Sequence, residues 1–422
     1  MIQDGARETL ALRGGTRIDG RGGTPVRSSL IIARGEVISH IGTGDPTRGV
    51  PTLELDGCTV LPGLIDAHVH LGLSSDIERF TARRVSLAEI AARIFRTCEE
   101  TLDAGFTTVR DCGGIDGGVV AVVEQGLVRG PRVICAGPIH SQTGGHGQLD
   151  PTTAEVGRAG WQDHIGLTAA ARACDGPDQV RWATREAFRR GASFIKMCVT
   201  GGMVSHSDRL EDTQFTVDEI RAAVVEAAAR RTYVTVHSHN ADGIRNAIAA
   251  GVRCIEHGSF LDEEAARQMA DAKVSFVPTL AVTRLLETDY AEMGLSPDIA
   301  TRAAGVLKAA VNSIHIAKAA GVNVGAGSDL IGPLQNRRGL ELVLRATATD
   351  PMEAIVASTA TNARIIGLQQ RLGTLEEGKL ADLIAVRGDP LAEPAVLDDP
   401  SKIVLVVKGG RVVKNLLHNN TL

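Results

Sequence analysis

Short apolar runs separated by longer amphipathic stretches dominate the middle of the chain. Ala-rich stretches such as 217–231 and 301–321 predict helices, and the short runs between such stretches predict buried strands. Eight runs meet this description: 60–71, 107–111, 132–137, 194–199, 233–238, 254–258, 274–280 and 322–329. Alternation of helices with eight strands predicts an α/β protein built as a (β/α)₈ TIM barrel.

The two ends of the chain have a different pattern. Residues 9–61 and the last fifty residues contain short alternating or β-branched runs between glycine-rich turns, which predicts strands joined by tight connections. Each set alone would be marginally stable, so we expect both ends to form one small β-sandwich. The predicted domains are therefore a β-sandwich of 1–61 and 371–422 and a barrel of 62–370.

Composition and charge narrow the choice of partners. Of the 422 residues, 43% are hydrophobic and 23% charged, which suits a globular protein with a large core. Aromatic residues make up only 3%, the net charge is −5, and the chain has no long basic run. These values argue against nucleic acid and anionic membranes as partners and leave a small-molecule substrate.

Cysteine usage and the N-terminus bear on location. Seven scattered cysteines without a CxxC pair argue against a disulfide framework or a structural zinc knuckle. The N-terminal residues lack the basic and apolar regions of a signal peptide, and no apolar stretch approaches 18 residues. We therefore expect a cytoplasmic protein.

Polar residues recur where the predicted strands end. In a barrel of this kind, the chemistry lies at the carboxyl ends of the strands. The first strand ends in His68 and His70, which are two residues apart and so face the same side. A single histidine there could equally be a hydrogen-bonded core residue, but a pair at strand spacing favours metal ligation.

Other strands repeat the pattern. The fifth ends in His237 and His239, the sixth in Glu256 and His257, and the eighth in Asp329. Lys196 lies inside the apolar run of the fourth strand. A lysine in that position must be paired, be functional, or extend to water at the strand end.

These segments resemble the amidohydrolase superfamily, and within it the branch of prolidases and imidazolonepropionases. The resemblance rests on VLPGLIDAHVHL, FIKMCVTGG, VHSHNADGIRNAIAAGVRCIEHG, GSDL and GTLEEGKLADLIAV, in this order, and it covers essentially the whole chain. It implies a metal-dependent hydrolase with two divalent ions, for which Zn²⁺ suits the ligand types best. It also implies a homo-oligomer.

The resemblance further implies a role for each strand-end residue. His68 and His70 would bind the more buried metal together with Asp329, and His237 and His257 would bind the second. Lys196 would be carboxylated and bridge both ions through its carbamate. His239 is assigned to substrate contact, although relatives often have tyrosine at that position.

The implied mechanism is hydrolysis by a water that two metal ions activate together. Asp329 would accept the proton of that water and deliver it to the leaving amine. His146, in the GGHG segment to which the resemblance extends, is the candidate donor to the developing oxyanion. The alternative is that the glycines around His146 merely shape a surface turn.

The substrate contacts rest on weaker signals. Arg209, in the loop after the fourth strand, could pair with a substrate carboxylate, because the forked guanidinium group of arginine fits the two carboxylate oxygens. It could equally be a solvated loop arginine. His206 in the same loop is similarly open. The remaining histidines at no strand end are expected to be structural or on the surface: His40, His164, His315 and His418.

We expect an amide hydrolase that releases a C-terminal amino acid from a dipeptide, an N-acyl amino acid or an aryl-acyl amino acid of the ochratoxin type. The two-metal set with a bridging lysine fits deamination less well. The first alternative is a cyclic-amide hydrolase or a lactonase, which would not need to recognise a free carboxylate. The second is a non-catalytic assembly protein of the same fold, which should show a broken ligand set.

Overall fold

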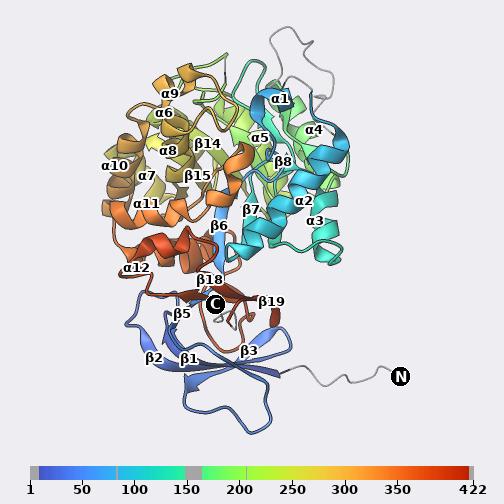
Figure 1. Cartoon of the computed structure of the whole chain (residues 1–422). Helices are drawn as coiled ribbons and strands as arrows, with labels where there is room; N and C mark the ends of the chain where they lie inside the picture. Colours follow the sequence, from blue (N-terminus) through green and yellow to red (C-terminus); the bar gives the residue numbers. More distant parts are fainter. Residues whose placement is uncertain (1–8, 82–83, 148–163, 206, 418–422) are drawn as a thin grey trace. The chain divides into compact units, whose positions relative to one another are not determined.

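The computed structural model describes residues 9–81, 84–147, 164–205 and 207–417 (Figure 1). The described chain divides into two compact units. One comprises the described residues of Met1–Ile65, Thr101–Thr108 and Leu342–Leu422, and the other Asp66–Glu100 and Val109–Glu341. Both terminal segments thus belong to one unit, as the sequence pattern predicts.

The predicted barrel strands are present. A sheet of parallel pairs runs in the order β12-β10-β13-β14-β15-β16, and a second has the order β6-β7-β9. The strands are β6 (Leu64–Val69), β7 (Phe106–Asp111), β9 (Arg132–Cys135), β10 (Ile139–Ser141), β12 (Ala171–Ala173), β13 (Ile195–Cys198), β14 (Val234–Asn240), β15 (Cys254–Phe260) and β16 (Ser275–Val277). A separate pair joins β8 (Gly114–Ile115) to β11 (Thr168–Ala169).

The eighth predicted strand, residues 322–329, closes the ring with isolated bonds rather than as a regular strand. On one side Phe276 of β16 bridges Val324, and the amide of Gly325 donates to the carbonyl of Phe276 at 2.8 Å. On the other side the amide of Ala67 in β6 donates to the carbonyl of Ala326 at 3.2 Å. This closure gives the (β/α)₈ barrel that the alternation predicts.

Helices connect the strands, and α5, α6 and α10 pack on β14 and β15 (Figure 1). Thr216 and Glu219 form a reciprocal capping box that starts α5, and Gly251 in the left-handed conformation ends α6. The helices are α1 (Ile77–Thr81), α2 (Leu87–Asp103), α3 (Gly117–Glu124), α4 (Gly176–Arg189), α5 (Val217–Ala229), α6 (Ala241–Ala250), α7 (Glu263–Asp271), α8 (Leu280–Thr288), α9 (Pro297–Ala303), α10 (Val306–Ala319), the 3₁₀ helix η1 (Gly332–Arg337) and α11 (Leu340–Ala348).

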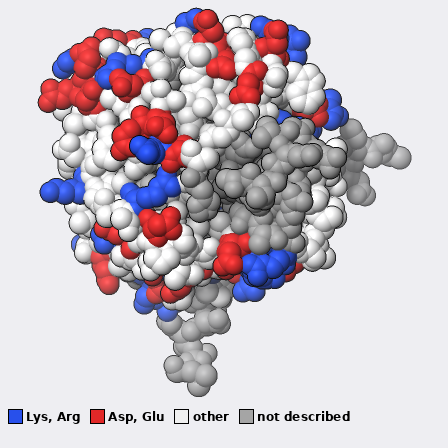
Figure 2. All heavy atoms as spheres, turned by 90° about the horizontal axis from the view of Figure 1, so that it is seen from above, with Lys and Arg blue, Asp and Glu red and all other residues white. Residues whose placement is uncertain are grey.

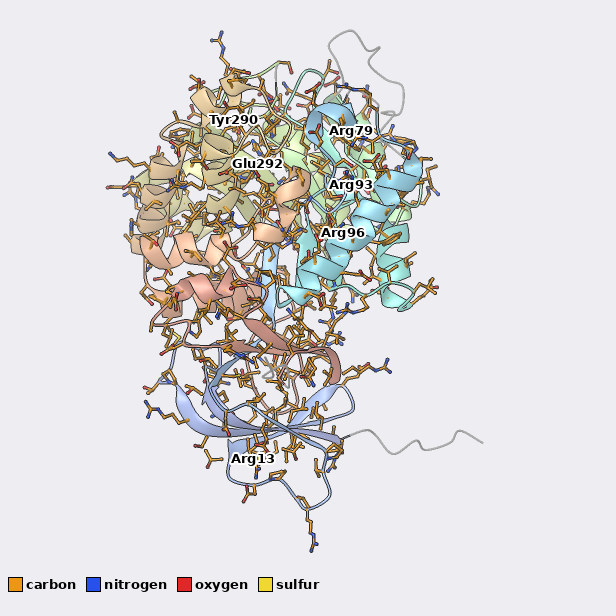
Figure 3. All side chains as sticks on the ribbon, in the orientation of Figure 1. Arg13, Arg79, Arg93, Arg96, Tyr290 and Glu292 are labelled. Carbon is orange, nitrogen blue, oxygen red and sulfur yellow. The ribbon has the colours of Figure 1, made fainter. Side chains whose placement is uncertain are left out.

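The outer face of α2 is polar. Arg93 lies 3.0 Å from Glu89, which also pairs with Arg79 of α1, and Arg96 lies 2.7 Å from Glu100 (Figure 3). The opposite face of the helix buries Ile90, Ile94 and Cys98, among others. This division is the amphipathic pattern by which the sequence predicts helices.

The β-rich unit interleaves both ends of the chain. Its sheet has the order β19-β18-β17-β5-β1-β2-β3, with β4 paired to β1. The strands are β1 (Thr9–Arg17), β2 (Val26–Arg34), β3 (Val37–Thr43), β4 (Thr52–Glu54), β5 (Cys58–Pro62), β17 (Leu383–Arg387), β18 (Ile403–Lys408) and β19 (Arg411–Asn415). The same unit contains α12 (Pro351–Val356), the π-helix η2 (Ala357–Thr361), α13 (Asn362–Ile365) and the 3₁₀ helix η3 (Pro394–Leu397).

The antiparallel pairing of β5 with β17 joins the two ends, with Val60 opposite Ala385. Side chains from both ends, including Leu12, Ile31 and Leu405, share one hydrophobic core. Both termini therefore build one β-rich module around a single sheet, while the predicted domain bounds of 1–61 with 371–422 and of 62–370 stay a prediction.

The described surface is of mixed charge. Figure 2 shows acidic and basic side chains interspersed over the face that it displays. None of the helices in the described ranges is long and apolar enough to cross a membrane.

Candidate metal centre

The six residues that the sequence singles out as metal ligands lie together in the barrel unit. His68 belongs to β6, Lys196 to β13, His237 to β14 and His257 to β15, while His70 follows β6 and Asp329 ends the eighth barrel segment. The five basic side chains belong to buried residues, and the Asp329 side chain is 15% exposed. Parallel strands bring their carboxyl ends to one rim, which is why residues far apart in sequence meet here.

Three of these side chains form a tight inner cluster. Nε2 of His68 and Nε2 of His70 are 3.3 Å apart, and Oδ1 of Asp329 lies 3.3 Å from the first and 3.1 Å from the second. Each Nδ1 atom faces away from the cluster: that of His68 lies 2.8 Å from Glu256, and that of His70 lies 2.7 Å from the carbonyl oxygen of Gly113. Both histidines thus direct Nε2 toward the same point, close to Oδ1 of Asp329.

His237 and His257 lie beside this cluster. Nε2 of His237 is 3.1 Å from the carbonyl oxygen of Gly201, and Nδ1 of His257 is 2.8 Å from Oγ1 of Thr279. The two rings are 4.4 Å apart at their centroids, and the His257 ring is 4.9 Å from that of His68. Each ring is therefore held through one nitrogen.

Lys196 is the buried cation at this site. Its Nζ atom lies 3.4 Å from Nε2 of His68, and the residue is only 2% exposed. An ammonium group so far from water needs compensation. The expected alternative, a lysine that extends along the strand to solvent, does not fit this burial.

The donor set fits a divalent metal ion. A metal at about 2.0–2.2 Å from its nitrogen and oxygen ligands holds neighbouring ligand atoms roughly 3–3.5 Å apart, which is the spacing in the inner cluster. Burial lowers the pKa of His68 to about 4 and holds the pKa values of His237 and His257 well below the usual range, so these rings keep lone pairs for a metal. His68, His257 and Asp329 place one ligand atom each within 4.8 Å of one another.

The backbone at this site is strained. His257 and Asp329 adopt φ angles of 68° and 54°, in the left-handed region that side chains other than glycine rarely occupy. Gly327 allows the closest approach, because a Cβ atom there would lie 2.5 Å from Cβ of His68. Strain of this kind persists where the surrounding structure holds a functional side chain in place.

A buried ion pair lies behind His68. Arg110 donates to Oε1 of Glu256 at 2.6 Å, while Oε2 of Glu256 faces Nδ1 of His68, and none of the three side chains is exposed. Burial alone would raise the pKa of Glu256, but the charge of Arg110 and the interactions with His68 and Lys196 together outweigh it and lower that pKa. The glutamate is thus an ionised acceptor that orients His68.

The metal site opens into a pocket of about 820 Å³, which includes its solvent-filled mouth. Apart from the site residues, its described wall is mainly apolar. The apolar lining comprises Leu73, Ile77, Ile139, Ala170, Cys198, Met203, Val204, Val282, Leu286 and Ile331. A pocket with one polar end and apolar walls suits a substrate whose reacting group is flanked by apolar parts.

His146 also lines this pocket. Its ring stacks on that of His237 with centroids 4.2 Å apart, and its Nδ1 atom lies 2.8 Å from Oγ of Ser205. Gly202 leaves room for the imidazole ring, because a Cβ atom at residue 202 would lie 2.3 Å from Cε1 of His146. Burial lowers the pKa of His146 to about 4, so the ring is neutral at pH 7.

The other two candidate substrate contacts differ in position. His239 lines the pocket, with Nδ1 2.9 Å from Oγ of Ser259, and burial lowers its pKa to about 3. Arg209 is exposed and is not among the residues that line the pocket. His206 lies outside the described residues.

None of the histidines expected to be structural or on the surface lies at this centre, as far as the chain is described. His40 and His315 are exposed, and His164 is half-buried and bridges Thr168. His418 lies outside the described residues.

The sequence does not reveal the residues that hold the ligands and His146. Arg110 and Arg302 are far in sequence from their partners, and Ser205 and Asp208 lie in a loop without a periodic pattern. Glu256 carries a signal, since it is a charged residue inside an apolar strand next to His257. Its partner Arg110 likewise follows an apolar run, so the two could have been proposed as a buried pair.

Comparisons with known proteins agree with this geometry. The family model described as "Amidohydrolase family" matches residues 59–413. The chain is 31% identical to ochratoxinase of Aspergillus niger over 411 residues, which covers 93% of this chain and 84% of the relative. A crystal structure of a prolidase complexed with N-methylphosphonate-L-proline is similar with a TM-score of 0.91 and 35% identity, covering 96% of this chain and 100% of the other. A Xaa-Pro dipeptidase with bound methionine in the active site has a TM-score of 0.85, 30% identity and coverages of 96% and 100%.

Proposed function

The chain belongs to the amidohydrolase family and is a hydrolytic enzyme of metal-dependent amide chemistry, and from this premise we propose a binuclear amidase that releases a C-terminal amino acid. The observation that carries the proposal is the convergence of six ligand-type side chains, five of which line a largely apolar pocket. The substrates would be dipeptides, N-acyl amino acids or aryl-acyl amino acids.

His68, His70 and Asp329 would hold one ion, and His237 and His257 the other. Lys196 would bridge both as a carbamate, because conversion of its buried amine to an anionic oxygen ligand would remove the unfavourable burial of an ammonium group. Two divalent ions, Zn²⁺ by ligand type, would supply an activated water and polarise the scissile carbonyl.

The chain's own residues would handle the proton. Burial alone would raise the pKa of Asp329, but its interactions with His68, His70 and Lys196 together lower that pKa, so its carboxylate is ionised and able to accept a proton. Its Oδ2 atom is 3.7 Å from the His257 ring, while Oδ1 is engaged by His68 and His70. Asp329 would pass the accepted proton to the leaving amine.

The apolar wall would select the groups on either side of the scissile bond. Ile139, Met203 and Leu286 belong to this wall and would pack against an aliphatic or aromatic side chain. The names of the relatives fit this preference, since one is an ochratoxinase and another is a Xaa-Pro dipeptidase with bound methionine. His239 would contact the substrate from the same wall.

One observation favours the alternative of a lactone or cyclic amide. Among the described residues that line the pocket, Lys196 is the only lysine or arginine, and it is already assigned to the metals. A free substrate carboxylate would then need Arg209, whose position on the surface loop leaves its role a prediction. Assembly into a homo-oligomer likewise remains a prediction.

A matched substrate series separates these functions. The zinc-loaded enzyme would be assayed on N-benzoyl-L-phenylalanine, on the same compound with its carboxylate blocked as a primary amide, and on an aromatic lactone. The proposal predicts that the enzyme hydrolyses the first compound and that its activity is lost when the carboxylate is blocked. Turnover of the lactone alone would establish the alternative instead.

A further inference from the structure

A chain of hydrogen bonds leads from the pocket into the loop after β13. Nδ1 of His146 contacts Oγ of Ser205, and the hydroxyl of Ser205 donates to Oδ1 of Asp208. The backbone amide of His146 is held separately, by Oε1 of Gln214 at 2.9 Å. His146, Ser205 and Asp208 are called the relay below.

Asp208 accepts every hydrogen bond it makes within the described chain. Besides Ser205, the amide of Gly202 donates to its Oδ1 at 3.1 Å and Nε2 of Gln214 donates to its Oδ2 at 3.0 Å. The guanidinium of Arg302 lies 3.8 Å from the same carboxylate. Its carboxylate oxygens are thus surrounded by donors and a cation and act as acceptors.

The direction of each bond in the relay follows from this. A serine has one hydroxyl proton, and that of Ser205 points to Asp208, so its oxygen offers only a lone pair to His146. Nδ1 of His146 must therefore carry a proton. Because a neutral imidazole has one N–H group, its Nε2 atom is left as an acceptor.

The loop is built to hold this arrangement. Arg302 of α9 donates to the carbonyl oxygens of Gly202, Ser205 and Asp208, at 2.5 Å and 2.9 Å for the first and last. Ser205 is 2% exposed and Asp208 8% exposed. The guanidinium thus fixes the backbone of the loop at three carbonyl groups and holds Ser205 and Asp208 close to each other.

We propose that Ser205 and Asp208 are positioning residues that fix His146 with its Nε2 lone pair in the pocket, where it accepts a hydrogen bond from the N–H group of a secondary amide substrate. This proposal rests on the proposed amidase function and reverses the donor role expected for His146. The ring lines the pocket and stacks on that of His237, so it lies beside the metal site, where the scissile amide would bind. A tertiary amide has no N–H group and therefore cannot donate this hydrogen bond to Nε2.

The tautomer is measured without activity. In zinc-loaded protein with ¹⁵N-labelled histidine, a His146→Asn variant identifies the His146 signals. The proposal predicts a protonated Nδ1 and an unprotonated Nε2 in the wild type, loss of that fixed tautomer in Ser205→Ala, and its return in Ser205→Thr. Ser207→Ala is the matched control, because Ser207 lies in the same loop, is exposed, and donates to the carbonyl oxygen of Gly144 instead. A protonated Nε2 in the wild type, or the same tautomer in Ser205→Ala, would overturn the proposal.

The substrate role is measured by comparing a secondary amide with its N-methylated counterpart. The kcat/KM of the wild type should be higher for the secondary amide than for its N-methylated counterpart. In His146→Ala the ratio of the two kcat/KM values should be about tenfold smaller. An equal loss on both substrates would overturn the acceptor role. A wild type that is inactive on every amide but has the expected tautomer would contradict the amidase function and leave the positioning of His146 intact.

Discussion

Oε2 of Glu256 lies 2.8 Å from Nδ1 of His68, and neither side chain is exposed. The contact fixes which nitrogen of His68 faces the metal site, because Nδ1 donates to the carboxylate and Nε2 is left unprotonated. Arg110 and Thr235 bind the other oxygen of the same carboxylate. The carboxylate of Glu256 thus orients His68 toward the inner cluster.

Replacement of Glu256 by glutamine should weaken metal binding by about 10–100-fold, because His68 loses its ionised acceptor. Competition with a chromophoric chelator measures the affinity directly. The surface variant Glu264→Gln, whose side chain is 56% exposed on α7, should bind metal as the wild type does.

Glu256→Gln also leaves Arg110 buried without its charge partner, which costs about 3–5 kcal/mol of stability. Thr235→Val keeps that ion pair and removes one hydrogen bond to Glu256. It should therefore stay folded and show a smaller loss of affinity. Unchanged affinity in both variants would contradict the orienting role of Glu256.

Lys196→Ala should lose metal and activity together, because the proposed bridge between the ions disappears. A carbamate is also observable by itself: ¹³C-labelled bicarbonate should give a carbamate signal in the wild type and none in the variant. Lys308→Ala, at an exposed position of α10, is the control. A fully active Lys196→Ala protein with two bound ions would refute the bridging role.

Met203→Ala should raise KM for substrates with a large apolar side chain and change kcat little. Met203 lines the apolar wall, and an apolar contact of this size is worth about 1–3 kcal/mol, or roughly 10–200-fold. Met352→Ala, a half-buried methionine that does not line the pocket, should have no effect on KM. An unchanged KM for Met203→Ala would show that the substrate does not reach this wall.

His140 should make the fold acid-sensitive. It is fully buried between the carbonyl oxygen of Pro138 and Oγ1 of Thr184, and burial lowers its pKa from 6.5 to about 4. Between these values the unfolded chain binds more protons than the folded one, so stability falls as the pH drops from 6.5 toward 4. The shift corresponds to about 3 kcal/mol.

Denaturant unfolding of metal-free protein across that range measures the effect. His140→Gln should lose less stability on acidification than the wild type, because the residue no longer takes up a proton on unfolding. His315→Gln, an exposed histidine, should have the wild-type slope. Identical slopes in all three proteins would mean that His140 is not neutral in the fold.

The sequence predicts the barrel and the meeting of the strand-end side chains well because both depend on local pattern. Strand spacing places His68 and His70 on one side, and apolar runs fix where Lys196 and His257 lie. The eighth segment is the exception, since residues 322–329 are correctly placed but joined by isolated bonds rather than a regular ladder.

Contacts between distant residues could not be read in the same way. Arg302 is almost a hundred residues from the carbonyl oxygens it binds, and nothing in its helix marks it as a loop clamp. The direction of the hydrogen bond at His146 depends on which groups surround Asp208. These groups come together only in the folded loop, so the sequence alone does not show which of them surround Asp208.

The most direct test of the account is the metal content of the purified protein, measured with its activity before and after treatment with a chelator. The account predicts about two divalent ions per chain, together with release of a C-terminal amino acid that the chelator abolishes and zinc restores. Amide hydrolysis that persists in metal-free protein, or full activity with a single ion per chain, would contradict the two-metal site.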